Sequence, residues 1–125
     1  MSMHNSFVAT YAHHGLAEID IEKMQNAGFD MNRVRVIARN PHHIAEQWRL
    51  APVLSSFGEL DAEFVECIPE EDIVDYEAEL GTGRLFIVAH ASPDEIEQAK
   101  RIADSSHQTS WDGIADSAIY YGCAD

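Results

Sequence analysis

The feature that most constrains the fold is a nearly continuous apolar run from Leu85 to Ala91, broken only by His90. A strand with one face in water alternates apolar and polar residues, whereas a continuous apolar run is typical of a strand buried on both sides. Gly81 and Gly83 precede the run and are suited to ending a helix and turning the chain. We therefore predict a central strand over this run.

Carboxylates crowd the residues on either side of this strand and raise the question of an acidic catalytic or metal site. Helix starts account for them. Pro69 suits the first position of a helix, and Glu70–Asp72 then lie at the positive end of the helix dipole, where each contributes roughly 0.3–1 kcal/mol when exposed. Ser92 and Glu95 have the spacing of a capping box around Pro93. The sequence thus predicts helices before and after the strand and requires no catalytic carboxylate.

The remaining patterns predict one more helix and three more strands. Apolar residues at helical spacing, followed by a glycine suited to closing a helix, predict a helix whose buried positions are Ala17, Ile21, Met24 and Ala27. Strands are predicted at residues 7–12, 33–38 and 117–122.

This order of elements predicts an α+β fold in one domain, residues 1–125, with a variable central segment at 41–67. A ferredoxin-like sandwich, with a four-stranded sheet and helices on one face, fits the order. A small parallel α/β sheet is the alternative, because the extra helix before the central strand would reverse the direction of that strand.

The charge balance restricts the partners. The chain carries 22 acidic and 8 basic residues, a net charge of −14, which disfavours nucleic acids and anionic membrane surfaces. The sequence has no apolar run near the ~20 residues that cross a bilayer, and its start lacks the pattern of a secretory signal. We expect a cytoplasmic protein with no cofactor.

The central segment carries more large apolar side chains than a connecting loop needs. Since structureless loops of this length are uncommon in compact domains, these side chains indicate a subunit or partner contact. We expect a homo-oligomer, or docking of another protein, and the candidate interface residues are Trp48, Leu50, Val53, Leu54 and Phe57.

Histidines near strand ends give the alternative, a small metal-binding protein or enzyme. His13 follows the first predicted strand, His42 follows the second, and His90 lies near the end of the central strand. Imidazoles that converge in this way can bind zinc or iron. The sequence contains no HxxxH or HExxH spacing, and an antiparallel sheet would place His90 at the opposite edge from His13. We therefore expect these histidines to be exposed polar residues, unless the sheet is parallel.

The two cysteines, Cys67 and Cys123, stand far apart in the sequence and in no metal-binding or redox motif. We expect both to be reduced and structural.

Two segments of the chain resemble a known family. The first matching segment is "AGFDMNRVRVIAR", at the end of the first predicted helix and in the strand after it. In the second half, the matching positions are Ile68–Glu71, Tyr76-Glu77, Gly81/Gly83 and Leu85–Val88. Together, residues 7–40 and 68–104 resemble the general stress protein (heat-induced stress protein) domain family. The central segment differs from the glycine-rich hydrophobic hairpin of many members, so membrane association does not carry over. The resemblance implies a stress-associated cytoplasmic module with no established reaction and no catalytic residues.

Overall fold

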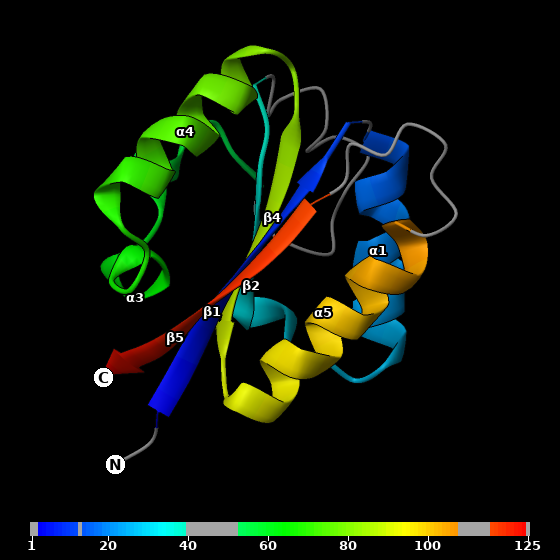
Figure 1. Cartoon of the computed structure of the whole chain (residues 1–125). Helices are drawn as coiled ribbons and strands as arrows, with labels where there is room; N and C mark the ends of the chain where they lie inside the picture. Colours follow the sequence, from blue (N-terminus) through cyan, green and yellow to red (C-terminus); the bar gives the residue numbers. More distant parts are fainter. Residues whose placement is uncertain (1–2, 13, 40–52, 108–115, 125) are drawn as a thin grey trace.

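One mixed sheet runs through the middle of the molecule in the computed structural model, which describes residues 3–12, 14–39, 53–107 and 116–124 (Figure 1). The described elements follow one another as β1 (Met3–Tyr11), α1 (His14–Asn26), η1 (Met31–Arg33), β2 (Val34–Ile37), β3 (Val53–Leu54), η2 (Phe57–Glu59), α3 (Ala62–Val65), α4 (Glu70–Gly81), β4 (Leu85–Ala91), α5 (Pro93–His107) and β5 (Asp116–Ala124). None of the described helices has the length and apolar character that a bilayer span needs.

The sheet has the strand order β3-β2-β4-β1-β5. The central strand β4 is antiparallel to both of its neighbours, with Val88 opposite Val8 of β1 and Ile87 opposite Val36 of β2. β5 is antiparallel to β1, and the short β3 is parallel to β2. The α+β class is confirmed, whereas the parallel α/β alternative is wrong. The predicted strand count of four is also wrong, because the segment between β2 and β4 adds β3 as a fifth strand.

β4 occupies the predicted central position, and all seven of its residues are buried. Helices cover both faces of the sheet, with α1 and α5 on one side and α3 and α4 on the other (Figure 1). The expectation of helices on one face is therefore wrong. The physical reason is that the chain between β2 and β4 carries its own apolar residues, which bury a second face of the sheet.

Two hydrophobic cores result, one on each face. On the α1/α5 face, side chains of odd-numbered residues of β1 and β4, such as Phe7 and Ile87, pack against Ile21 and Ile96. On the α3/α4 face, the even-numbered Val8 and Phe86 pack against helix and loop residues. The second core is completed by Ile37, Phe57, Leu60, Phe64, Ile68, Leu80 and Val88.

The helix ends follow the predicted chemistry. Gly28 has a φ of 84°, and the N–H of Phe29 donates to the carbonyl of Met24 at 3.0 Å, so α1 closes in a Schellman motif. Pro69 is the N-cap residue of α4, so α4 begins at Glu70, one residue later than the predicted start at Pro69. Ala27 lies beyond the helix and is exposed, which corrects its predicted burial.

Candidate functional site

The predicted interface residues are not one surface patch in the described part of the chain. Trp48 and Leu50 lie outside the described residues. Val53 and Leu54 form β3 and are half-buried, each against a different core. Phe57 is only 2% exposed and lies beside the Tyr76 and Phe86 rings at 5.4 and 5.1 Å, so it belongs to the core of this chain.

The predicted metal ligands are not brought together in the described structure. His13 and His42 lie outside the described residues, so a site that uses them stays a prediction. His90 pairs in register with Ser6 near the start of β1, as expected for an antiparallel sheet. The residues that the structure describes contain no group of three or more His, Cys, Asp or Glu side chains arranged to hold a metal ion.

His90 is buried, which corrects the expectation of an exposed polar side chain. Ser6 Oγ donates to the carbonyl oxygen of Phe64 at 3.0 Å and lies 3.1 Å from His90 Nδ1. Because the one hydroxyl hydrogen of Ser6 goes to that carbonyl, His90 Nδ1–H donates to Ser6 Oγ. A nucleophilic serine needs the opposite direction, with its hydrogen pointed at the imidazole. This buried pair therefore ties α3 to the sheet and does not form a nucleophile.

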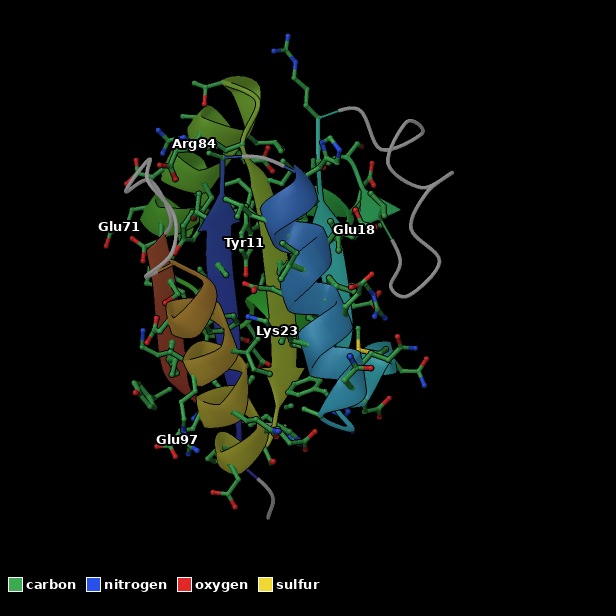
Figure 2. All side chains as sticks on the ribbon, turned by 90° about the vertical axis from the view of Figure 1, so that its right-hand side faces the viewer. Tyr11, Glu18, Lys23, Glu71, Arg84 and Glu97 are labelled. Atoms are coloured by element: carbon green, nitrogen blue, oxygen red, sulfur yellow. The ribbon has the colours of Figure 1, made fainter. Side chains whose placement is uncertain are left out.

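The acidic side chains around α4 do not converge on one point. Glu70 and Glu71 are exposed at the helix start, and Figure 2 labels Glu71 at the surface of this helix. Glu77 accepts a hydrogen bond from the N–H of Phe57 at 2.7 Å, and Glu79 pairs with Arg84 at 2.9 Å. The helix-start explanation fits Glu70 and Glu71, whereas Glu77 and Glu79 contact neighbouring segments of the chain.

A chain of hydroxyl groups links α4 to β5. Tyr120 Oη donates to Asp72 Oδ2 at 2.8 Å, so the 2.6 Å contact between the two tyrosine hydroxyls is a donation from Tyr76. Burial, together with the hydrogen bonds to Tyr76 and Asp72, raises the pKa of Tyr120 well above its ordinary value. Tyr120 is therefore neutral at physiological pH and acts as a structural link.

A fully buried tyrosine, Tyr11, lies between β1 and α1 (Figure 2). Tyr11 Oη donates to Asp20 Oδ2, and both side chains are 1% exposed. Burial first, and then the negative charge of Asp20, raise the pKa of Tyr11 well above its ordinary value. The pair is sealed from solvent, so its role is to anchor α1 on the sheet.

Cys67 is disulfide-bonded, so the expectation of a reduced side chain is wrong for this residue. It lies in the turn between α3 and α4, and its Sγ atom is 3.7 Å from the carbonyl oxygen of Tyr120 in β5. The distance in sequence between the two cysteines had favoured the reduced form, but the sheet brings β5 back to this turn.

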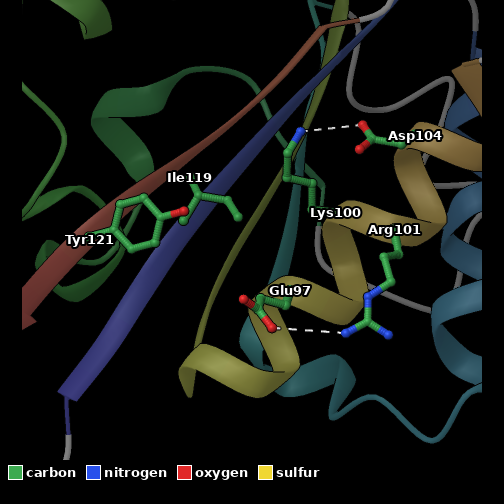
Figure 3. A pocket seen from close by; sticks show the side chains of 6 residues that line it. All are labelled: Glu97, Lys100, Arg101, Asp104, Ile119 and Tyr121. Carbon is green, nitrogen blue, oxygen red and sulfur yellow. Dashed lines mark hydrogen bonds and ion pairs between the residues drawn. The ribbon is translucent and has the colours of Figure 1, made fainter.

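The best candidate for a functional surface lies where β5 meets α5. β5 has nine residues and stands at the edge of the sheet, with β1 as its one neighbouring strand in the described part of the chain. A surface pocket of about 300 Å³ opens beside it (Figure 3). Its lining residues are Glu97, Lys100, Arg101 and Asp104 of α5 with Ile119 and Tyr121 of β5. We call this region the β5–α5 surface.

The charges of the β5–α5 surface are balanced, in contrast to the acidic chain as a whole. Two carboxylates face two cations: Arg101 lies 3.9 Å from Glu97, and Lys100 lies 3.4 Å from Asp104. Tyr121 is 72% exposed, more than the two other exposed large hydrophobic residues, Ile19 and Val74, of the described part. An exposed aromatic ring beside charge pairs is typical of a protein contact surface.

Sequence reasoning did not identify this surface. The spacing of Glu97 with Arg101 and of Lys100 with Asp104 was visible as helical charge pairs, but such pairs are common on solvated helices. The sequence patterns do not reveal that β5 lies at the sheet edge, because this position depends on how distant strands pair. Comparisons of the chain with protein-family models, curated proteins and solved structures found no match.

Proposed function

We propose that this chain is a non-catalytic, stress-associated module that acts by self-association, and that two copies meet through the β5–α5 surface. The observation that carries the proposal is the nine-residue edge strand β5 beside a charge-balanced helix face. The stress association rests on the resemblance of residues 7–40 and 68–104 alone.

The edge strand supplies the first argument. An edge strand offers backbone N–H and C=O groups to another strand, and proteins usually protect long edges with lysine, proline or a short length. β5 exceeds the usual strand length of about five to six residues and contains no lysine or proline, and its β-bulge, another device that protects edges, lies near its end, after Tyr120. Two antiparallel β5 strands from two copies would continue the sheet across a two-fold axis.

Charge supplies the second argument. Two chains of net charge −14 repel each other, so association needs a surface where the local charge is not negative. α4 carries six acids and no base, whereas the four charged pocket residues of α5 sum to zero. In a two-fold pair with antiparallel α5 helices, Glu97 of one copy would meet Arg101 of the other. The contact is therefore self-complementary.

The proposed architecture is a ferredoxin-like core with an insertion. Four of the strands have the order β5-β1-β4-β2, and α1 and α5 lie on one face of them. This is the arrangement expected of a split βαβ sandwich. The segment from β3 to α4 would then be the insertion, which covers the opposite face and leaves β5 at an edge.

The test is the solution mass at several protein and salt concentrations, by light scattering after size exclusion or by sedimentation. We expect twice the 14.0 kDa chain mass, with tighter association at higher salt because salt screens the repulsion of the two acidic copies. Tyr121→Glu places a charge at the contact and should give a monomer. Val74→Glu is the matched control, since Val74 is 62% exposed on α4 across the sheet, and it should keep the parent mass.

A wild-type protein that stays monomeric at every concentration and salt would refute self-association. A Tyr121→Glu variant that keeps the parent mass would refute the β5–α5 surface as the contact. Docking of a different protein in place of a second copy would show as a monomer whose association appears only with that partner and is lost in the same variant.

A further inference from the structure

The disulfide at Cys67 lies beside the C-terminal half of β5. Cys67 is half-buried in the turn that joins α3 to α4, so it is in part accessible to solvent. Its Sγ atom is 3.7 Å from the carbonyl oxygen of Tyr120. The chain contains one other cysteine, Cys123, and this residue is in β5, three positions after Tyr120.

The register of β1 and β5 places position 123 next to the same region. Tyr120 is opposite Ser6 and Cys123 is opposite His4, so two residues of β5, Tyr121 and Gly122, stand opposite the single residue between them on β1. This is a β-bulge, which inserts one residue into one strand. Side chains alternate along a regular strand, so positions 120 and 123 would otherwise lie on opposite faces. The extra residue restores position 123 to the face of Tyr120.

We propose that Cys67 and Cys123 form a reversible redox clasp that fastens the end of β5 to the α3–α4 turn. The surrounding contacts give the clasp a defined place. His4 and His90 have ring centroids 5.1 Å apart, and the Phe64 ring of α3 lies 5.9 Å from His90. These ring contacts bring α3, the start of β1 and the end of β4 together on one side of the sheet, and the 3.7 Å contact of Cys67 Sγ with the Tyr120 carbonyl oxygen adds β5 to the same region.

The chemistry is thiol–disulfide exchange with a dithiol reductant. A thiolate of the reductant attacks one sulfur of the disulfide and forms a mixed disulfide, and the second thiol of the reductant displaces the protein sulfur. Two electrons and two protons pass from the dithiol to the protein, leaving two cysteine thiols and an oxidised, cyclic reductant. In a reducing compartment the bond would form only under oxidation, so the clasp would respond to oxidative conditions.

Opening the clasp should loosen β5 and leave the centre of the sheet intact. The disulfide closes a loop of about 56 residues between the two cysteines, and a loop of that size restricts the unfolded chain strongly. We expect reduction to raise amide hydrogen exchange in residues 119–124 on the order of 10²- to 10³-fold, with a much smaller change in β4. Reduction should also weaken self-association, and this last consequence rests on the proposed function.

The pairing is tested first. Protein purified in the presence of an alkylating agent should show no reactive thiol before treatment with dithiothreitol and two after it, and peptide mass spectrometry should find Cys67 joined to Cys123. Reoxidation should restore the bond. Two free thiols under oxidising conditions, or a bond between two chains, would overturn the proposal.

Hydrogen exchange then tests whether the disulfide holds β5 in place. The measurement uses the Tyr121→Glu variant, so that a change in self-association cannot alter the exchange of the β5 amides. Cys67→Ser and Cys123→Ser are matched variants, and each should reproduce the exchange of the reduced parent without added reductant. Exchange in β5 that is the same in the oxidised, reduced and serine forms would overturn the clasp. Self-association that does not respond to reduction, with β5 exchange responding, would count only against the proposed interface.

Discussion

Replacing Tyr11 by phenylalanine tests the buried pair that anchors α1 on the sheet. The substitution removes one hydroxyl and keeps the ring that packs in the α1/α5 core. The lost interaction is a hydrogen bond from Tyr11 Oη to Asp20 Oδ2, between two side chains that are each 1% exposed. A hydrogen bond to a charged group contributes about 1.5–3 kcal/mol, so we expect the free energy of unfolding at pH 7 to fall by about 2 kcal/mol. For a domain of this size that is a decrease in melting temperature of about 8 °C.

The same variant has a predictable pH dependence. In the unfolded chain a tyrosine titrates near pH 10, whereas burial and the charge of Asp20 raise the pKa of Tyr11 in the folded chain. A raised folded pKa gives stability that is complete below the unfolded pKa and is lost as pH rises toward the folded one. Wild type should therefore lose up to about 1.4 kcal/mol per pH unit above pH 10 through Tyr11, and Tyr11→Phe should not.

Urea unfolding followed by circular dichroism at pH 7, 9, 10 and 11 measures both effects. The stability gap between wild type and Tyr11→Phe should be constant from pH 7 to 9 and should narrow by about 1 kcal/mol or more by pH 11. Tyr120 is present in both proteins, so its own titration cancels in the difference. Tyr121→Phe, at a 72% exposed position, is the control and should change stability by less than about 0.5 kcal/mol. A gap that does not change with pH would refute the assignment of Tyr11 as a buried, carboxylate-bound phenol.

Two pairs of substitutions separate core packing from backbone strain. Phe57→Ala should lower the free energy of unfolding by about 3–5 kcal/mol in urea titrations, because the ring is 2% exposed between Tyr76 and Phe86, whereas Val74→Ala on the outside of α4 should change it by less than about 0.5 kcal/mol. Comparable losses for the two would contradict the placement of Phe57 in the core. Gly28→Ala should cost at least about 1 kcal/mol, because the φ of 84° is unfavourable for a residue with a Cβ atom. Gly15→Ala in α1 should stabilise by up to about 1 kcal/mol, because its added Cβ meets no atom within 4 Å, and equal effects at the two glycines would contradict the Schellman closure.

Much of the local structure could be predicted because it depends on neighbouring residues. The apolar run of β4, the glycine at the end of α1 and the Ser92–Glu95 pair each act over a few positions; the structure confirms the first two, and it shows Ser92 and Glu95 in contact at the start of α5. Ser92 Oγ lies 2.9 Å from Glu95 Oε1 and 3.4 Å from the backbone N–H of Glu95. Propensity and capping are local energies, so one sequence suffices to predict them.

The candidate surface could not be predicted, because it depends on strand order. Tyr120 and Tyr121 are adjacent in sequence, yet Tyr120 bonds to Asp72 of α4 while Tyr121 lies on the α5 side of the sheet. The position of β5 beside β1 decides that Tyr120 packs against a core and that Tyr121 lies at the surface. The disulfide at Cys67 was likewise invisible in sequence, because cysteine spacing gives no information on a register shift between distant strands.

The sequence by itself determined the α+β class, the buried central strand, the helix ends and the excess of negative charge, since each is set by composition or by residues a few positions apart. Only the tertiary structure decided that β3 joins the sheet, that helices cover both faces, that His90 is buried and that β5 is an edge strand among the strands described. The physical reason is that these features arise from contacts between residues dozens of positions apart. These contacts form because both faces of the sheet are apolar and must be buried, and segments distant in sequence supply the side chains that bury them.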